Sequence, residues 1–138
     1  MRALLDTNIV LDFVLARAPF YAEADEIFVR LQTGDFEAFI SPITPINVFY
    51  TTRKEIDKPT AFAAIEELLK VVEITGCDKR IFQNALALNF NDYEDAVQAA
   101  CASAENLDAI VTRNAKDYKN AALPVYSPTD FLQILKRI

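Results

Sequence analysis

The stretch Arg2-Ala3-Leu4-Leu5-Asp6-Thr7-Asn8 decides how the rest of the chain is interpreted. It is a short apolar run that ends on a carboxylate, a hydroxyl and an amide. In an α/β protein, a buried strand that precedes a helix delivers its last side chains to the crevice at the carboxyl edge of the sheet, where ligands bind. Asp6 would stand in that crevice. The alternative is that Asp6 or Asn8 only caps the helix that follows, because both residue types accept hydrogen bonds from free helix N–H groups.

Strands and helices alternate along the rest of the chain. Apolar residues at helical spacing predict helices near residues 9–19, 21–32, 45–53, 59–69, 78–88, 91–102 and 127–138, and short apolar runs predict strands at 37–41, 71–74, 109–111 and 125–126. This alternation indicates an α/β fold with a mostly parallel sheet covered on both faces. A length of 138 residues suits one domain and is too short for two ordinary ones.

The composition excludes several classes of function. The chain has no histidine, which removes Ser-His and Cys-His catalysis and any His-ligated zinc. Only 2 glycines are present, so a Gly-rich loop for ATP or NAD cannot be built. The net charge of −6 argues against nonspecific polyanion binding by the whole surface. No apolar run is long enough to span a membrane, and Cys77 and Cys101 form no CxxC pair, so we expect a cytoplasmic protein with free thiols.

Polar side chains recur where strands end and helices begin. Because parallel strands share one carboxyl edge, the topology can gather these side chains in one place. For the later residues the alternative is again local: Asp92 caps a helix, Asp95 and Glu94 compensate its dipole, and Asn47 is an ordinary exposed amide. The residues of this kind are Asp6, Asn8, Asn47, Asp92, Asp95, Thr112, Asn114 and Asp117.

The gathered carboxylates point to a hard metal ion. Two carboxylates about 4 Å apart repel by roughly 4 kcal/mol at an effective dielectric of 20, a cost that protonation or a cation relieves. All-oxygen ligands without His or Cys favour Mg²⁺ or Mn²⁺. Such an ion lowers the pKa of a bound water and neutralises charge on a phosphodiester. Hydrolysis of a phosphate ester by a metal-activated water therefore follows as the predicted chemistry.

The sequence resembles the PIN-domain nucleases, a family that includes the VapC-type toxins of bacterial toxin–antitoxin pairs. The resemblance covers nearly the whole chain. Its motifs are Leu4-Leu5-Asp6-Thr7-Asn8-Ile9-Val10-Leu11-Asp12, then Ser41-Pro42-Ile43-Thr44 before a helix, Asp92-Tyr93-Glu94-Asp95-Ala96 opening another helix, and Ile110-Val111-Thr112-Arg113-Asn114 followed by Asp117-Tyr118.

The resemblance implies one PIN-like domain over residues 1–138, with three α/β/α layers around a mostly parallel sheet of about five strands. It also implies an endoribonuclease that depends on Mg²⁺ or Mn²⁺, forms a homodimer and is neutralised by an antitoxin protein. The metal ligands of the family map onto Asp6, Asp95 and Asp117, with Asp92 as a further catalytic acid. Thr112 and Asn8 would orient ligands and water.

Two positions depart from the family pattern. Asn47 stands where the family usually has Glu, and Asn114 stands where it often has Asp, so each departure removes a negative charge. They favour an alternative function, in which an inactive PIN-like domain binds RNA or a protein partner. A basic rim beside the acids would bind the RNA phosphates, the alternative being ordinary solvated helix surface. Its predicted members are Arg53, Lys54, Arg113 and Lys116.

Overall fold

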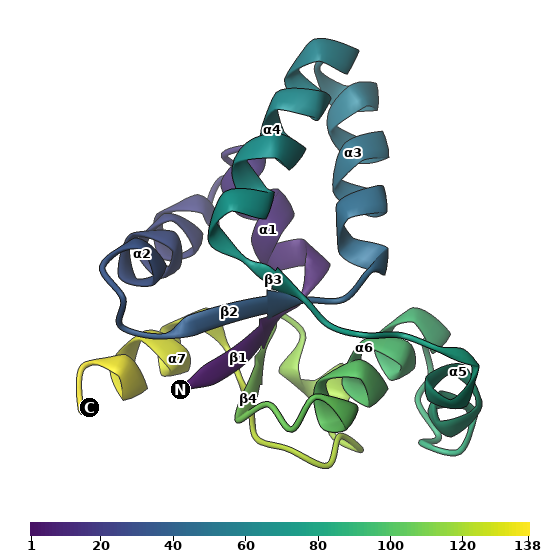
Figure 1. Cartoon of the computed structure of the whole chain (residues 1–138). Helices are drawn as coiled ribbons and strands as arrows, with labels where there is room; N and C mark the ends of the chain where they lie inside the picture. The colour runs from purple at the N-terminus through teal and green to yellow at the C-terminus, as the bar shows by residue number, and fades with distance from the viewer.

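A five-stranded parallel sheet forms the centre of the computed structural model, which describes residues 1–138. The strand order is β3-β2-β1-β4-β5, and every neighbouring pair is parallel. The predicted fold is therefore confirmed, with β1 at the centre of the sheet (Figure 1). The strands are β1 (Arg2–Leu5), β2 (Glu37–Ile40), β3 (Glu73–Ile74), β4 (Ala109–Val111) and β5 (Val125–Tyr126).

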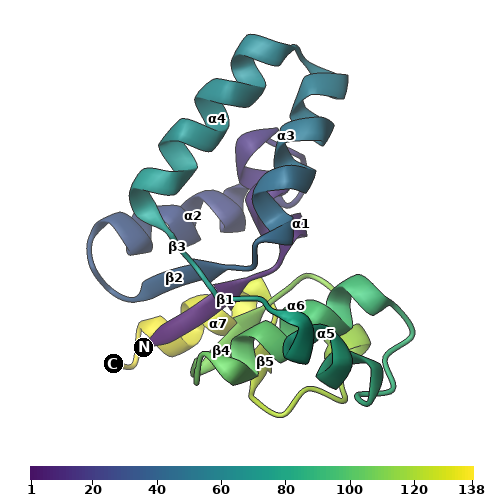
Figure 2. The same cartoon turned by 45° about the vertical axis from the view of Figure 1, so that its right-hand side comes forward.

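Helices connect the strands and cover both faces of the sheet. A hairpin of two helices, α3 and α4, extends away from the sheet, and α5 and α6 lie together on the other side of the molecule (Figures 1 and 2). None of the helices combines the length and the apolar character needed to cross a membrane. The helices are α1 (Thr7–Val14), α2 (Tyr21–Gln32), α3 (Ile43–Glu55), α4 (Lys58–Val71), α5 (Lys79–Leu86), α6 (Tyr93–Ala104) and α7 (Pro128–Leu135), with a 3₁₀ helix η1 (Ala115–Tyr118).

The alternation of side chains along β1 divides the core in two. Ala3 and Leu5 face the larger apolar cluster, which includes residues of α1, α2 and α7. Leu4 faces the opposite way, toward Ala99 and Ala102 of α6. Because alanine side chains are short, they let α6 approach the sheet closely. The acidic start of α6 is thereby held next to the carboxyl end of β1.

Three predicted boundaries near the candidate site were wrong. β1 ends at Leu5, and Thr7 and Asn8 already belong to α1. The helix α3 begins at Ile43 rather than Pro45, because the first N–H groups of a helix need no intrahelical acceptor and a proline fits there. Asn47 consequently lies in the second turn of α3. Residues 71–74 were predicted as one strand, but α4 continues to Val71 and only Glu73 and Ile74 form β3.

Candidate active site

Asp6 anchors the candidate site, directly after β1. It occupies the N-cap position of α1 with an extended backbone, yet its carboxylate makes no capping hydrogen bond. The capping alternative for Asp6 was therefore wrong. The residue is only 5% exposed. Its carboxylate accepts hydrogen bonds from Gln98 Nε2 (2.8 Å), Thr112 Oγ1 (2.7 Å) and Asn8 Nδ2 (3.2 Å). Three neutral donors from three separate parts of the chain hold this buried carboxylate in one orientation.

Gln98 is a site residue that the sequence interpretation missed. It lies in the middle of α6, fully buried, between alanines that pack on the sheet. Its amide contacts Asp6 on one side and the hydroxyls of Ser41 and Thr44 on the other. The available signal was a lone glutamine within the otherwise small and apolar stretch Ala96–Ala102. A buried primary amide requires several partners, so its position should have indicated a polar network.

The first turn of α6 brings further carboxylates to the same place. Asp92 accepts a hydrogen bond from the Asp95 backbone N–H at 3.0 Å and so caps α6, as the local alternative for this residue expected. The Asp95 carboxylate is half-buried and accepts a hydrogen bond from the Tyr118 hydroxyl at 3.2 Å. Burial, together with the nearby charges of Asp6 and Asp92, raises the pKa of Asp95 from its ordinary value to about 7, against the opposing effect of the Tyr118 hydrogen bond.

Glu94 joins this group through a contact between α3 and α6. The Asn47 amide donates a hydrogen bond to Glu94 Oε1 at 2.7 Å. Burial and the charges of Asp92 and Asp6 raise the pKa of Glu94. Asn47 was expected to face Asp6, and the hydrogen bond that its side chain makes goes to Glu94. A carboxylate from α6 thus stands next to the amide of α3, so the negative charge that position 47 lacks is present nearby. We call Asp6, Asp92, Glu94 and Asp95 the site carboxylates.

The segment after β4 contributes neutral groups and one acid. Thr112 is fully buried, donates to Asp6, and accepts a hydrogen bond from the Asn114 backbone N–H at 3.0 Å. Asn114 lies at the start of η1 without a side-chain cap. Asp117 is exposed on η1, and its side chain makes no hydrogen bond or ion pair, although its charge also raises the pKa of Asp95. The structure thus brings Thr112 into the site and places Asp117 at its margin.

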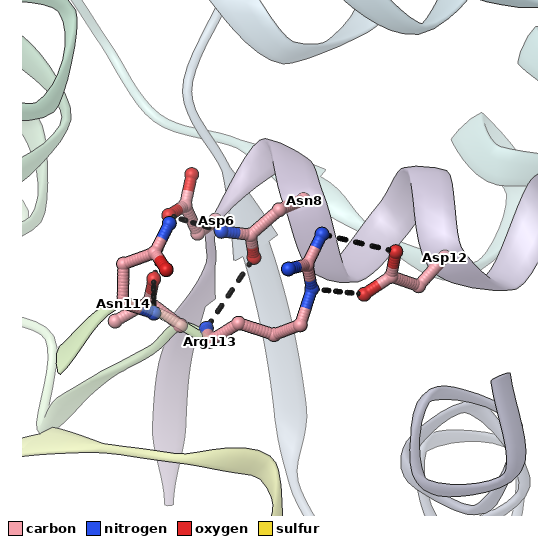
Figure 3. A network of polar contacts seen from close by, with 6 residues as sticks. Asp6, Asn8, Asp12, Arg113 and Asn114 are labelled. Carbon is pink, nitrogen blue, oxygen red and sulfur yellow. Dashed lines mark hydrogen bonds and ion pairs between the residues drawn. The ribbon is translucent and has the colours of Figure 1, made fainter. Parts of the chain in front are cut away.

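Arg113 points away from Asp6 and toward α1, as Figure 3 shows. Its guanidinium donates to both carboxylate oxygens of Asp12, at 2.6 and 3.3 Å, and lies 3.9 Å from the centre of the Phe20 ring. Asp12 is only 1% exposed. The positive charge of Arg113 is therefore already paired within the protein. The other predicted rim cations, Arg53, Lys54 and Lys116, are exposed and form no ion pair.

We expect Arg113→Ala to lower the free energy of unfolding by about 3 kcal/mol, because it leaves the buried carboxylate of Asp12 without its cation. Lys116→Ala, on the exposed face of η1, is the matched control and should change stability by no more than about 0.5 kcal/mol. Urea unfolding of both variants measures the difference. Equal stability of the two would contradict a structural role for the Arg113–Asp12 pair.

The site carboxylates fit a hard cation by their chemistry, although they do not form a complete metal cage. No three Asp, Glu or Cys side chains are arranged to hold a metal ion by themselves. However, none of the site carboxylates has a cationic partner among the ion pairs of the structure. Mg²⁺ commonly uses only one or two carboxylates, retains several waters and takes further oxygens from substrate phosphates. The oxygen-only donors present here match that mode of binding.

The raised pKa of Asp95 predicts how stability depends on pH. The unfolded chain releases this proton near pH 3.8, whereas the folded protein retains it to about pH 7. The native state therefore binds more protons in this window, and the metal-free protein should lose stability as the pH rises from about 4 to about 7. Melting temperatures of wild type and Asp95→Asn should diverge over that range, with the variant higher at pH 8. A constant difference from pH 4 to 8 would contradict the assignment.

Comparisons with known proteins agree with the fold. A family model described as PIN domain matches residues 2–116. Ribonuclease VapC1 of Aquifex aeolicus (strain VF5) is 25% identical over 137 residues, which is 96% of this chain and 94% of the relative. A toxin-antitoxin complex from Klebsiella pneumoniae contains a chain 28% identical, with a TM-score of 0.68 over 91% of this chain and 97% of that one. VapBC2 from Rickettsia felis, bound to a DNA fragment from its promoter, gives 20% identity and a TM-score of 0.71, covering 92% and 98%.

Proposed function

Because the chain belongs to the PIN domain family, we propose that it is a divalent-metal-dependent endoribonuclease that hydrolyses RNA phosphodiester bonds. The observation that carries this proposal is the grouping of Asp6, Asp92, Glu94 and Asp95 without any cationic partner. Asp92 stabilises the start of α6 as its cap, but bringing the four carboxylates together costs folding energy, since like charges at short range repel. The name of the Aquifex aeolicus relative, a ribonuclease, supports RNA as the substrate.

Each site residue has a defined part in this proposal. Asp6 and Asp95 would hold the Mg²⁺ or Mn²⁺ ion, with Asp117 at the margin as a further ligand. When bound, the ion would supply an activated water and neutralise charge on the phosphodiester. Thr112 and Asn8 keep the carboxylate oxygens of Asp6 aimed into the site through their hydrogen bonds. Asp92 fixes the first turn of α6 by capping it, and this places Asp95.

We further propose that the protein is the toxin of a toxin–antitoxin pair and acts as a homodimer in the cytoplasm. The toxin-antitoxin complexes among its structural relatives support a protein partner. The hairpin of α3 and α4 has large apolar side chains on its surface, and exposed apolar groups of this kind mark protein-binding sites. They include Ile46, Tyr50, Ile56, Phe62 and Leu69.

A thermal shift assay with a cleavage assay tests the enzymatic proposal. Mn²⁺ at ten times its Kd should stabilise the folded protein by about 1.4 kcal/mol, or roughly 5 °C in melting temperature, because it binds the folded site only. Single-stranded RNA should be cleaved with Mn²⁺ and left intact with EDTA. Absence of any divalent binding at millimolar metal and neutral pH would remove the physical basis of the proposal.

Asn47 and Asn114 favour one alternative function, that of an inactive PIN-like domain which binds RNA or protein. Both are amides at positions where carboxylates would increase the negative charge of the site. RNA binding that persists in wild type without any cleavage in Mn²⁺ would establish this alternative. Cleavage that Asp95→Asn abolishes would exclude it.

A further inference from the structure

Gln98 joins four separate parts of the chain through one buried amide. Its Oε1 accepts hydrogen bonds from Ser41 Oγ and Thr44 Oγ1, both at 3.1 Å. Its Nε2 donates to Asp6 Oδ1 at 2.8 Å and to the Tyr118 hydroxyl at 3.1 Å. Ser41 follows β2, Thr44 belongs to α3, Asp6 follows β1, and Tyr118 ends η1. The amide therefore uses both its donors and both lone pairs of its acceptor, with no exposure to solvent.

The partners of Gln98 fix the direction of these hydrogen bonds. With the amide reversed, Oε1 would face the carboxylate of Asp6, and two acceptors would repel each other. Since the Tyr118 oxygen accepts from Gln98, its proton is free to point at Asp95 Oδ1, 3.2 Å away. At the oxygen end of the amide, the Thr44 hydroxyl donates its proton to Gln98 Oε1. Thr7 must therefore be the donor in the 2.8 Å contact between the Thr7 and Thr44 hydroxyls.

These directions form one chain of donors that begins at Thr7 and ends at Asp95, with a branch from Gln98 to Asp6. Through it, Gln98 contacts Asp6 directly and contacts Asp95 through a single hydroxyl. Asp6 lies between β1 and α1, whereas Asp95 belongs to α6, so no continuous backbone element sets their relative position. A buried amide whose hydrogen-bonding groups all have partners can set this relative position, because it contacts both parts of the chain.

The apolar surroundings make the choice of glutamine informative. The neighbours Ala99, Cys101 and Ala102 on α6 are apolar and buried. Replacing both partners of a buried hydrogen bond by apolar groups of the same shape can be nearly neutral for stability, so folding does not demand an amide at position 98. We propose that Gln98 is a positioning residue that fixes the carboxylates of Asp6 and Asp95 relative to each other. The predicted effect on catalysis rests on the proposed nuclease function, whereas the positioning of the two carboxylates does not.

Gln98→Met tests the inference, because methionine has a similar length and no strong hydrogen-bonding group. Cys101→Ala is the matched control: it shortens a buried side chain on the same helix, within the cluster that packs against α5. We expect Gln98→Met to lower kcat for RNA cleavage by 10- to 100-fold, as for other residues that orient metal ligands, with KM for RNA within about twofold. Cys101→Ala should lower the melting temperature while kcat stays within about twofold of wild type.

A second readout needs neither metal nor RNA. The carboxyl ¹³C resonances of Asp6 and Asp95 should shift or broaden in Gln98→Met and stay in place in Cys101→Ala. Tyr118→Phe, which removes the last link of this chain to Asp95, should combine with Gln98→Met in a non-additive way, because both act on one chain of hydrogen bonds. If Gln98→Met does not fold, Gln98→Asn, whose amide cannot span the same distance, takes its place.

Unchanged carboxyl resonances in the folded Gln98 variant would overturn the inference, whatever the activity. So would a kcat equal to that of Cys101→Ala. Wild type that cleaves no RNA and binds no Mn²⁺ would instead refute the proposed function, and the resonances would still decide the positioning role of Gln98.

Discussion

Asp95→Asn and Asp6→Asn should both abolish metal-dependent RNA cleavage but change stability in opposite directions. Under the proposed function each substitution removes a charged oxygen ligand, and a loss of several kcal/mol in the transition state lowers the rate by at least about 100-fold. Asp95→Asn relieves repulsion from Asp6 and Asp92 and retains an oxygen for the Tyr118 hydroxyl. We expect it to stabilise the metal-free protein at pH 8 by roughly 1 kcal/mol, after allowance for solvent screening.

Asp6→Asn should have the opposite effect on stability. All three side chains that contact the Asp6 carboxylate present hydrogen-bond donors to it, so its oxygens act only as acceptors. The new amide NH₂ must face Gln98, Thr112 or Asn8, and a buried donor without an acceptor costs about 1 to 3 kcal/mol. Urea unfolding and cleavage assays on both variants measure the two effects. Glu66→Gln, which removes an exposed carboxylate on α4, is the control and should match wild type. Undiminished cleavage by both variants would assign the activity to a contaminating nuclease.

Asn47→Glu should destabilise the metal-free protein and tighten the binding of Mn²⁺. The substitution replaces a donor to Glu94 at 2.7 Å by a second carboxylate, so two like charges would meet at short range. We expect a loss of roughly 2 kcal/mol without metal. With metal, the added charge should lower the Kd for Mn²⁺ by about tenfold, because charged ligands tune the affinity of such sites. Thermal unfolding and isothermal titration, each with and without Mn²⁺, measure the pair of effects.

The double variant Asn47→Glu/Glu94→Gln is the matched control for this prediction. It moves the carboxylate from α6 to α3 and restores a donor–acceptor pair, so it should regain wild-type stability without metal. Its affinity for Mn²⁺ should stay near that of wild type. An Asn47→Glu variant with unchanged stability and unchanged Mn²⁺ affinity would show that Asn47 and Glu94 do not adjoin the metal site.

The parallel sheet could be predicted from the sequence because its signals are local. Apolar runs of strand length alternate with amphipathic segments, and this pattern admits few topologies. The position of Asp6 at the carboxyl edge followed from the same argument. The boundary between α4 and β3 was predicted wrongly near Val71, because the apolar run there is compatible with both the end of a helix and a strand.

The contacts of Glu94 and Gln98 could not be predicted in this way, because they depend on how α3 and α6 approach each other. From the sequence, Glu94 is an acid in the first turn of a helix, where it favours the helix dipole. Its role beside Asn47 follows from a contact between residues 47 positions apart. Arg113 shows the same limit: it was grouped with Lys116 by proximity in sequence, yet the structure pairs it with Asp12, 101 positions away.

The place of Asp6 directly after the central strand β1 has a consequence for the proposed RNA substrate. The Asp6 backbone N–H donates to Val111 O at 2.9 Å and thereby ties the residue to the neighbouring strand β4. Central strands open only in events close to global unfolding, so hydrogen exchange at this amide should be among the slowest in the protein. Asp6 consequently cannot move out to meet a duplex. Under the proposed nuclease function the nucleic acid has to bring its backbone to this acid, and this favours unpaired, flexible loops as the sites of cleavage.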